Sequence, residues 1–270
     1  MTRKKFIILS AIVSAFAIAL PFVCSEKLEE SSYSLSTDKL SSSAKIAFIS
    51  DLHNTLYGRD MSEITSSLER FRPDIVLLGG DFFDYVWGEP NSVKLAELLS
   101  ENYPCFYALG NHEFKRGQQD IIKKEMSALG IKVLDGKYAD AAVGDSTIRI
   151  HGIDGGSYKE QLSACTDAIL PDAFNILLNH YPEEFPELSR LGFDLILSGH
   201  AHGGQWRFPP ILPNGVISPG EGIFPYYTGG LYSENGSRML VSRGLQRCPR
   251  DIIIPRVFNR PEIVLITISH

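Results

Sequence analysis

The chain has 270 residues, a formal net charge of −6 at pH 7 and 44% hydrophobic residues. This length allows one or two globular domains, and the acidic balance gives no support to a nucleic-acid-binding protein, which would carry a basic stripe. The cysteines show no CxxC spacing, and the sequence has neither a GxxxxGKS/T loop nor a GxGxxG motif, so structural-zinc and nucleotide-cradle folds have no support.

Residues 1–25 are interpreted as an N-terminal membrane anchor or signal segment. The basic run Arg3–Lys5 precedes an apolar run over residues 6–23. A run of about 18 apolar residues is at the border between a signal-peptide core and a short membrane span. We expect one hydrophobic helix that crosses the membrane once, with the basic end in the cytoplasm and the remainder outside. Export after cleavage behind Ser25 and lipidation of Cys24 are the alternatives.

The rest of the chain predicts a tethered α/β domain. Residues 26–44 are rich in serine and charged side chains and lack apolar periodicity, which indicates a flexible linker. Residues 45–270 then alternate apolar runs with amphipathic segments, as expected for a layered α/β architecture. Strands are expected at residues 46–49, 75–78, 106–109, 147–150, 176–178, 195–197 and 263–268. Helices are expected at residues 61–71 after an Asp60 cap, 91–99 after an Asn91 cap, and 118–129 ending at Gly130.

A short polar motif follows each of five of these strands. The motifs are Asp51-Leu52-His53, Gly80–Asp84, Gly110–Glu113, Asn179-His180 and Gly199–His202, and they contain five of the seven histidines of the chain. Open α/β sheets bind ligands outside the carboxyl ends of their strands. The five strands therefore bring Asp, His and Asn side chains to one edge of the domain.

These side chains have the chemistry of a site for two metal ions. Carboxylate, imidazole and amide oxygen donors suit divalent Mn, Fe or Zn. The candidates are Asp51, His53, Asp81, Asn111, His180, His200 and His202. They are too many for one ion, which takes roughly four to six ligands including water. Two ions sharing a carboxylate would use them all, and Asp81, at the end of a central strand, is the expected bridge.

The ordered set D-x-H, G-D-x-x-D, G-N-H-E, H and G-H-x-H resembles the calcineurin-like metallophosphoesterases, from about residue 45 to the C-terminus. Four further stretches resemble the membrane-anchored bacterial branch of YkuE-type phosphodiesterases and a UDP-2,3-diacylglucosamine pyrophosphohydrolase of lipid A synthesis. They are Gly199–Pro209, Gly229–Tyr232, Val241–Gly244 and Pro261–Ile263. The resemblance implies a two-sheet β-sandwich flanked by helices, a four-layer α/β fold.

The resemblance also implies a role for each motif residue. One metal would be bound by Asp51, His53, Asp81 and His202, and the other by Asp81, Asn111, His180 and His200. A hydroxide between the metals would attack phosphorus, while His112 would protonate the leaving group and Asp84 would orient His112. Glu113 is instead expected to be solvated or to stabilise a turn. Asp154 is expected to stabilise a turn, with a contact to substrate as the alternative. His151 and His270 belong to no motif and are expected to be structural.

Three more residues are candidate substrate contacts, because they could bind a phosphate or head group: Gln205, Arg207 and Arg243. Residues 206–227 combine aromatic side chains with prolines that forbid a regular helix. This segment either packs on the domain or projects beside the site to meet lipid. The sequence thus predicts a membrane-associated binuclear hydrolase of a phosphodiester or pyrophosphate bond, in a substrate that is soluble or lipid-linked. The alternatives are a phosphomonoesterase acting on a soluble substrate and a non-catalytic scaffold.

Overall fold

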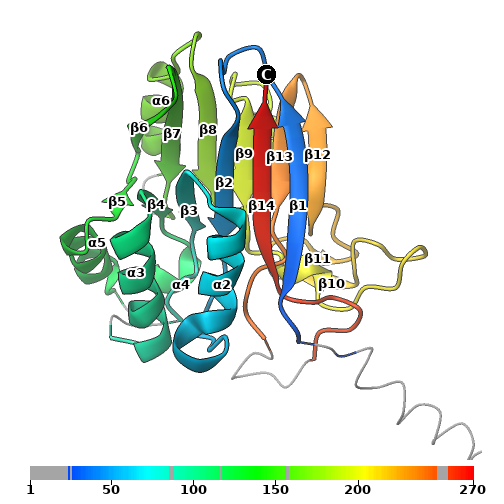
Figure 1. The fold of residues 1–270 in the computed structure, drawn as a ribbon. Coiled ribbons are helices and arrows are strands. Elements are labelled where there is room, and N and C mark those ends of the chain that lie inside the picture. Colours follow the sequence, from blue (N-terminus) through cyan, green and yellow to red (C-terminus); the bar gives the residue numbers. More distant parts are fainter. Residues whose placement is uncertain (1–23, 25, 85–87, 116, 156–157, 248–254) are drawn as a thin grey trace, which may run out of the picture.

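Two six-stranded sheets packed face to face form the centre of the molecule in the computed structural model (Figure 1). The structure describes residues 24, 26–84, 88–115, 117–155, 158–247 and 255–270. The first sheet has the strand order β1 (Glu29–Ser36), β14 (Glu262–Ser269), β2 (Ala44–Ile49), β3 (Ile75–Gly79), β4 (Cys105–Ala108) and β5 (Lys132–Val133). The second has the order β12 (Gly230–Glu234), β13 (Ser237–Val241), β9 (Leu195–Ser198), β8 (Phe174–Asn179), β7 (Ser146–Ile153) and β6 (Lys137–Val143).

Both sheets are mixed, with a parallel centre. In the first, β2 to β5 run parallel, and β14 runs antiparallel to β2. In the second, β7, β8, β9 and β13 run parallel, and the edge strands β6 and β12 run antiparallel to their neighbours. All seven strands expected from the sequence are confirmed; six agree within two residues at each end, and the strand expected at 147–150 extends three residues further, to Ile153.

The inner faces of the sheets form one apolar core. Alternate residues of β2 (Ile46 and Phe48) and of β8 (Phe174, Ile176 and Leu178) are fully buried in it. The intervening residues of the same strands point to the outer faces, since side chains alternate along a strand. Both faces of the central strands are therefore apolar, as in parallel sheets covered on both sides.

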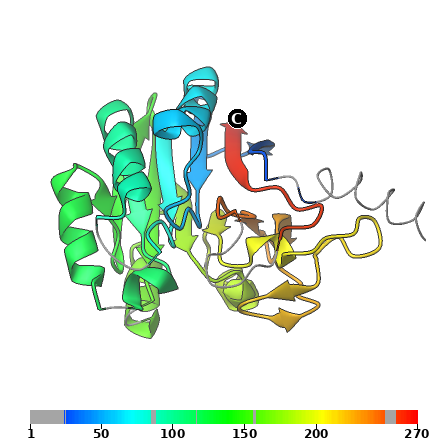
Figure 2. The same cartoon turned by 90° about the horizontal axis from the view of Figure 1, so that it is seen from below.

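Helices cover the two outer faces, so the sandwich has four layers (Figures 1 and 2). The first sheet is covered by α2 (Ser62–Phe71), α3 (Pro90–Asn102) and α5 (Gln119–Ala128), and the second by α6 (Tyr158–Asp167) and α7 (Phe185–Leu188). In α2, Ile64 and Leu68 lie one turn apart and are both fully buried against the sheet. The predicted α/β fold of mixed sheets flanked by helices is confirmed.

Two predicted helix caps are wrong. Asp60 belongs to a preceding 3₁₀ turn, η1 (Arg59–Met61), and Met61 is the residue before α2. Asn91 lies inside α3, and the side chain of Asn54 instead accepts hydrogen bonds from the backbone N–H groups of Asn91 and Ser92, at 2.8 and 3.3 Å. A distant side chain thus satisfies the free N–H groups at the start of α3, which no local pattern could have indicated.

The prediction of a flexible linker is wrong for much of residues 26–44, because Glu29–Ser36 forms β1. This strand pairs in parallel with β14 along its whole length, from Glu29 opposite Glu262 to Ser36 opposite Ser269. A strand with only Tyr33 and Leu35 as large apolar residues is stable here because β14 supplies the hydrogen-bonding partner. The sandwich therefore begins at Glu29. The predicted hydrophobic helix of residues 1–25 lies outside the described residues apart from Cys24, and no helix within the described part has the length and hydropathy of a transmembrane span.

Candidate metal centre

The predicted metal ligands converge at one end of the sandwich, although they come from both sheets. Asp51 and His53 follow β2, Asp81 follows β3, and Asn111 begins a short helix, α4 (Asn111–Phe114), after β4. From the second sheet, His180 follows β8, and His200 and His202 follow β9; His202 begins the 3₁₀ turn η3 (His202–Gly204). The parallel direction of these strands is what brings the seven side chains to the same edge.

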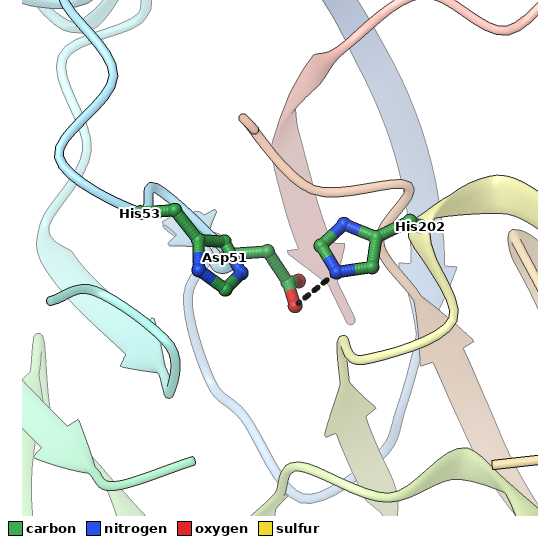
Figure 3. A group of neighbouring side chains, drawn as sticks. All are labelled: Asp51, His53 and His202. Atoms are coloured by element: carbon green, nitrogen blue, oxygen red, sulfur yellow. Dashed lines mark ion pairs between the residues drawn. The ribbon is translucent and has the colours of Figure 1, made fainter. Parts of the chain in front are cut away.

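The ligand atoms form overlapping groups. One group is Asp51, His53 and His202 (Figure 3), another is Asp81, His180 and His200, and a third is His53, Asp81 and His112. Within each group the ligand atoms lie within 4.8 Å of one another. One oxygen, Asp81 Oδ2, lies 3.6 Å from His53 Nε2 and 3.3 Å from His180 Nε2. Asp81 thus belongs to the second group and also lies beside His53 of the first group, which is the position expected of a shared ligand.

Several ligand atoms are buried without a hydrogen-bond partner. They are Asp51 Oδ2, His53 Nε2, Asn111 Oδ1, His180 Nε2 and His202 Nδ1. Buried polar atoms are nearly always hydrogen-bonded, because leaving one unpaired costs about 1–3 kcal/mol. For His180, the other ring nitrogen Nδ1 lies 2.8 Å from the Gly79 carbonyl oxygen, which fixes the ring and directs Nε2 toward Asp81. This donor set fits divalent cations better than it fits an apolar or purely hydrogen-bonded interior.

Five of the seven candidate ligands have a left-handed backbone. Their φ angles are 52° at Asp51, 44° at His53, 50° at Asp81, 63° at His200 and 46° at His202. Non-glycine residues in this region cost about 1–3 kcal/mol each and cluster at functional sites. Glycines allow the tight packing: a Cβ on Gly110 would lie 2.3 Å from Asp81 Oδ1, and one on Gly199 would lie 2.3 Å from Asp51 Oδ2.

A buried carboxylate holds the Asp81 loop in place. Glu113 is fully buried and accepts four backbone hydrogen bonds. Its Oε1 accepts from Phe82 and Phe83 at 2.8 and 3.0 Å, and its Oε2 accepts from Asp81 and Gly110 at 3.0 and 2.8 Å. The expected turn-stabilising role is confirmed, and the alternative that Glu113 is solvated is wrong. Glu113 connects the motif after β3 to the motif after β4.

His112 and Asp84 form a pair beside the metal ligands. His112 Nδ1 lies 3.0 Å from both the carboxylate Oδ1 and the carbonyl oxygen of Asp84, while His112 Nε2 lies 3.9 Å from Asp81 Oδ2. The same Asp84 oxygen is 3.1 Å from His53 Nδ1, so Asp84 orients two histidines rather than one. Burial works to lower the pKa of His112, but its hydrogen bond to the Asp84 carboxylate and the charge of Asp81 raise it above its ordinary value.

The two buried carboxylates, Asp51 and Asp81, favour positive charge in their immediate surroundings. Burial raises the pKa of Asp51. Burial also acts to raise the pKa of Asp81, but the charge of His180, 3.3 Å away, helped by that of His53, holds it well below its ordinary value. Burial alone would lower the pKa of His180, yet Asp81 and then Asp51 raise it to about 10. A cation beside Asp81 would supply the charge that the His180 proton otherwise provides.

The comparison with known proteins agrees with this geometry. The profile of the family "calcineurin-like phosphoesterase" matches residues 44–204, which include all seven candidate ligands. The chain belongs to the calcineurin-like phosphoesterase family. Two relatives over most of the chain are the uncharacterized metallophosphoesterase YkuE of Bacillus subtilis, 29% identical over 83% of this chain and 79% of its own, and the phosphodiesterase YaeI of Escherichia coli, 27% identical over 82% and 81%.

Other relatives are longer than this chain. An uncharacterized metallophosphoesterase of Campylobacter jejuni is 29% identical, but the match spans 66% of this chain and only 49% of that protein. Among solved structures, GAP50, described as the anchor in the inner membrane complex of Plasmodium, superposes with a TM-score of 0.54 at 13% identity, over 84% of this chain and 82% of its own. This likeness shows that the phosphoesterase fold is shared.

The predicted substrate contacts differ in how free they are to bind an anion. The Arg243 guanidinium bonds Glu262 and Glu29, with Arg243 Nη2 3.0 Å from Glu29 Oε1, so its donors join β1 and β14 instead of facing the metal ligands. Arg207 is half-buried, and burial together with the Arg243 charge lowers its pKa. Gln205 lies beside His202, and the Asn259 amide donates to the backbone oxygens of both.

The histidines and carboxyl groups outside the motifs have structural contacts. His151 Nε2 lies 3.2 Å from Asn175 Oδ1 in the interior, and His270 Nδ1 lies 3.1 Å from the Leu40 carbonyl oxygen. Asp154 pairs with Lys123 at 2.6 Å and accepts from Gln161. The contacts of His151 and His270 agree with the structural roles expected for them, whereas Asp154 contacts side chains of α5 and α6.

The sequence did not indicate three residues that lie near the candidate metal ligands. The Lys115 ammonium contacts His112 Nε2, and the Tyr181 ring lies 5.0 Å from the His200 ring, centroid to centroid. Arg256 is almost fully buried, with Nη2 3.4 Å from the Gly244 carbonyl oxygen, and Gly244 packs against Asp51. Tyr181 directly follows one motif and Lys115 lies two residues after another, so both could have been considered, whereas Arg256 is distant in sequence and gave no signal.

Proposed function

We propose that this chain hydrolyses a phosphodiester or pyrophosphate bond with the help of two divalent metal ions. The observation that carries the proposal is the set of buried imidazole, carboxylate and amide atoms without hydrogen-bond partners around Asp81. Asp51, His53, Asp81 and His202 would hold one ion, and Asp81, Asn111, His180 and His200 the other. Ions of Mn, Fe or Zn would neutralise phosphoryl charge and lower the pKa of a bound water.

The side chains around the metals then have distinct tasks. Because Asp84 accepts from the Nδ1 side of His112, the Nε2 side is left facing Asp81 and the metal ligands. A proton held on Nε2 can be donated to the oxygen that leaves phosphorus, and the carboxylate behind the ring keeps it in this orientation. In the structure the Lys115 ammonium contacts Nε2, so it would have to move aside when Nε2 carries the proton that is donated.

The name of one relative and two features of the N-terminal sequence bear on the substrate class. The Escherichia coli relative is named a phosphodiesterase, which favours a diester over a phosphomonoester. The apolar run of residues 6–23 favours action at a membrane surface, so the diester or pyrophosphate would belong to a lipid-linked substrate, of the kind of UDP-2,3-diacylglucosamine. The basic N-terminal end would direct the domain out of the cytoplasm, where nucleotide-linked lipids are not made, and this counts against that particular compound. A single N-terminal pass with an external catalytic domain, or export after cleavage, is the proposed location.

A panel of substrates tests this function. The purified chain is stripped with a chelator, reloaded separately with Mn, Fe or Zn, and assayed on bis(p-nitrophenyl) phosphate, p-nitrophenyl phosphate and a nucleotide diphosphate lipid. We expect activity to disappear on chelation, to return on reloading, and to be highest on the diester or the diphosphate. Full activity in protein shown by elemental analysis to be metal-free would refute the proposal. A clear preference for the monoester would favour the alternative of a phosphomonoesterase on a soluble substrate.

A further inference from the structure

Five large apolar side chains are exposed on the segment that follows the candidate ligand His202 and at Phe258, whose ring lies beside that of Phe208. We call these side chains the apolar rim. They are Phe208, Ile211, Ile223, Phe224 and Phe258. Their exposed fractions are 41%, 83%, 70%, 67% and 52%, respectively. Single exposed apolar residues are ordinary, but a group of them marks an interaction surface.

The rim is built on an ordered support that begins at the ligand His202. Two short strands, β10 (Ile217–Ser218) and β11 (Gly222–Ile223), pair with each other, and Phe224 N–H donates to the Val216 carbonyl oxygen at 2.8 Å. Val216 N–H in turn donates to the carbonyl oxygen of Gly204, in the η3 turn, at 2.9 Å. The rings of Phe208 and Phe258 lie 6.2 Å apart, centroid to centroid.

Only part of the segment over residues 206–227 packs back on the domain. Pro225 is buried, and the Tyr227 ring lies 5.8 Å from that of Phe185, in the core under the second sheet. Some side chains of this segment thus pack inward, as one of the two expectations has it, whereas the rim side chains are exposed. In Figure 2 the yellow part of the chain, which contains β10 and β11, projects away from the helices that cover the first sheet.

The direction of β1 places the N-terminal end of the domain at the metal-centre end of the sandwich. Since β1 is parallel to β14, and β14 is antiparallel to β2, β1 begins where β2 ends (Figure 1). Side chains connect these points: Glu29 bonds Arg243, and the next residue, Gly244, packs against Asp51. The apolar run ends at residue 23. The six steps from residue 23 to Glu29 can span at most about 21 Å.

We propose that the apolar rim docks on the surface of a lipid bilayer and turns the metal centre toward the lipid head groups. This inference rests on the proposed membrane insertion of residues 6–23. A connection this short keeps the metal-centre end of the domain at the bilayer, so the lipid surface is the apolar partner within reach of the rim. Aromatic and aliphatic side chains on a surface loop are also what interfacial docking requires.

The test measures the contact itself, independently of anchoring and of hydrolysis. The chain has two tryptophans, Trp87 and Trp206. A Trp87→Phe background leaves Trp206, which is 38% exposed and is connected to the rim support by the hydrogen bond from its backbone N–H to the Gly204 carbonyl oxygen at 2.7 Å. The full chain is reconstituted into vesicles of phosphatidylethanolamine and phosphatidylglycerol, with or without brominated acyl chains. We expect bromine to quench Trp206, and Ile223→Ser with Phe224→Ser to remove most of that quenching.

The matched control removes two exposed apolar side chains elsewhere, Ile121→Ser on α5 with Leu170→Ser before β8, and should keep the quenching. Both double variants should keep hydrolysis of a small soluble diester, which reports on the fold and on the proposed function separately. Absence of quenching in chains that float with the vesicles would overturn the docking but not the anchor. Chains that do not float at all would overturn both. A rim variant that loses a dimer in detergent while its quenching persists would assign the rim to a second copy of this chain.

Discussion

Replacing Glu113 with glutamine should destabilise the protein and loosen the metal centre, although the two side chains have nearly the same shape. The wild-type carboxylate accepts four backbone hydrogen bonds, two on each oxygen. A glutamine amide has one oxygen and one NH₂ group, so two of the four N–H donors would face another donor. These two donors would lie in a fully buried position where no water replaces the lost acceptor.

The size of the effect follows from these lost bonds. A hydrogen bond to a charged group contributes about 1.5–3 kcal/mol, and relaxation of the loop should recover part of the loss from two such bonds. We therefore expect the free energy of unfolding to fall by about 3 kcal/mol, which lowers Tm by about 6–12 °C in a chain of this size. Because one pair of bonds goes to Asp81 and Gly110, metal content should fall as well.

Urea denaturation followed by circular dichroism, together with elemental analysis, measures both effects. The matched control is Glu160→Gln, which makes the same chemical change on the exposed surface of α6 and should change stability by less than about 0.5 kcal/mol. If Glu113→Gln behaved like this control and kept its metals, the carboxylate would not be what holds the Asp81 loop.

Three further outcomes are expected. Asp81→Ala should remove both metals in elemental analysis, whereas His202→Ala should mainly remove one; equal losses would argue against a shared carboxylate. His112→Ala should keep the metals but lower turnover by about 10²–10⁴-fold, and less for nitrophenolate leaving groups that need no proton; an equal loss on all substrates would indicate positioning instead. Burial lowers the pKa of His151, so its contribution to stability is complete above about pH 6.5 and is lost as the pH falls through the lower folded-state pKa. His151→Gln should flatten this acid limb of the unfolding free energy against pH, and an unchanged limb would show that His151 takes up its proton without cost.

The strands and the candidate ligands could be predicted because their signals are local. An apolar run such as Ile75–Gly79, followed by Gly80 and Asp81, predicts both the strand and the functional residue at its end. The topology then brings the ends of these strands together, because parallel strands have their carboxyl ends on the same edge of the sheet.

The failures come from interactions between distant residues. β1 was missed because EESSYSLS has little apolar content, and its pairing with β14 crosses more than two hundred positions of the chain, from Glu29 to Glu262. The Asn54 cap of α3 and the four bonds of Glu113 likewise join motifs that no periodicity connects. Nor did the sequence indicate that the Arg243 guanidinium donates to the buried Glu262, which lies at the start of β14 in the other sheet.

The division of the ligands between the two sheets has a consequence for stability as well as for catalysis. Asp51, His53 and Asp81 are carried by the first sheet, and His180, His200 and His202 by the second. Asp81 Oδ2 and His180 Nε2 are 3.3 Å apart, although they belong to different sheets. A second carboxylate in place of His180 would repel Asp81 at this distance. A cation bound here would join the two sheets, and at a hundredfold excess over its Kd it would stabilise the fold by about 2.7 kcal/mol. That gain is of the same order as the cost of one or two of the left-handed ligand residues, at about 1–3 kcal/mol each. The strained backbone that presents the ligands is thus best tolerated when the metals that need it are bound.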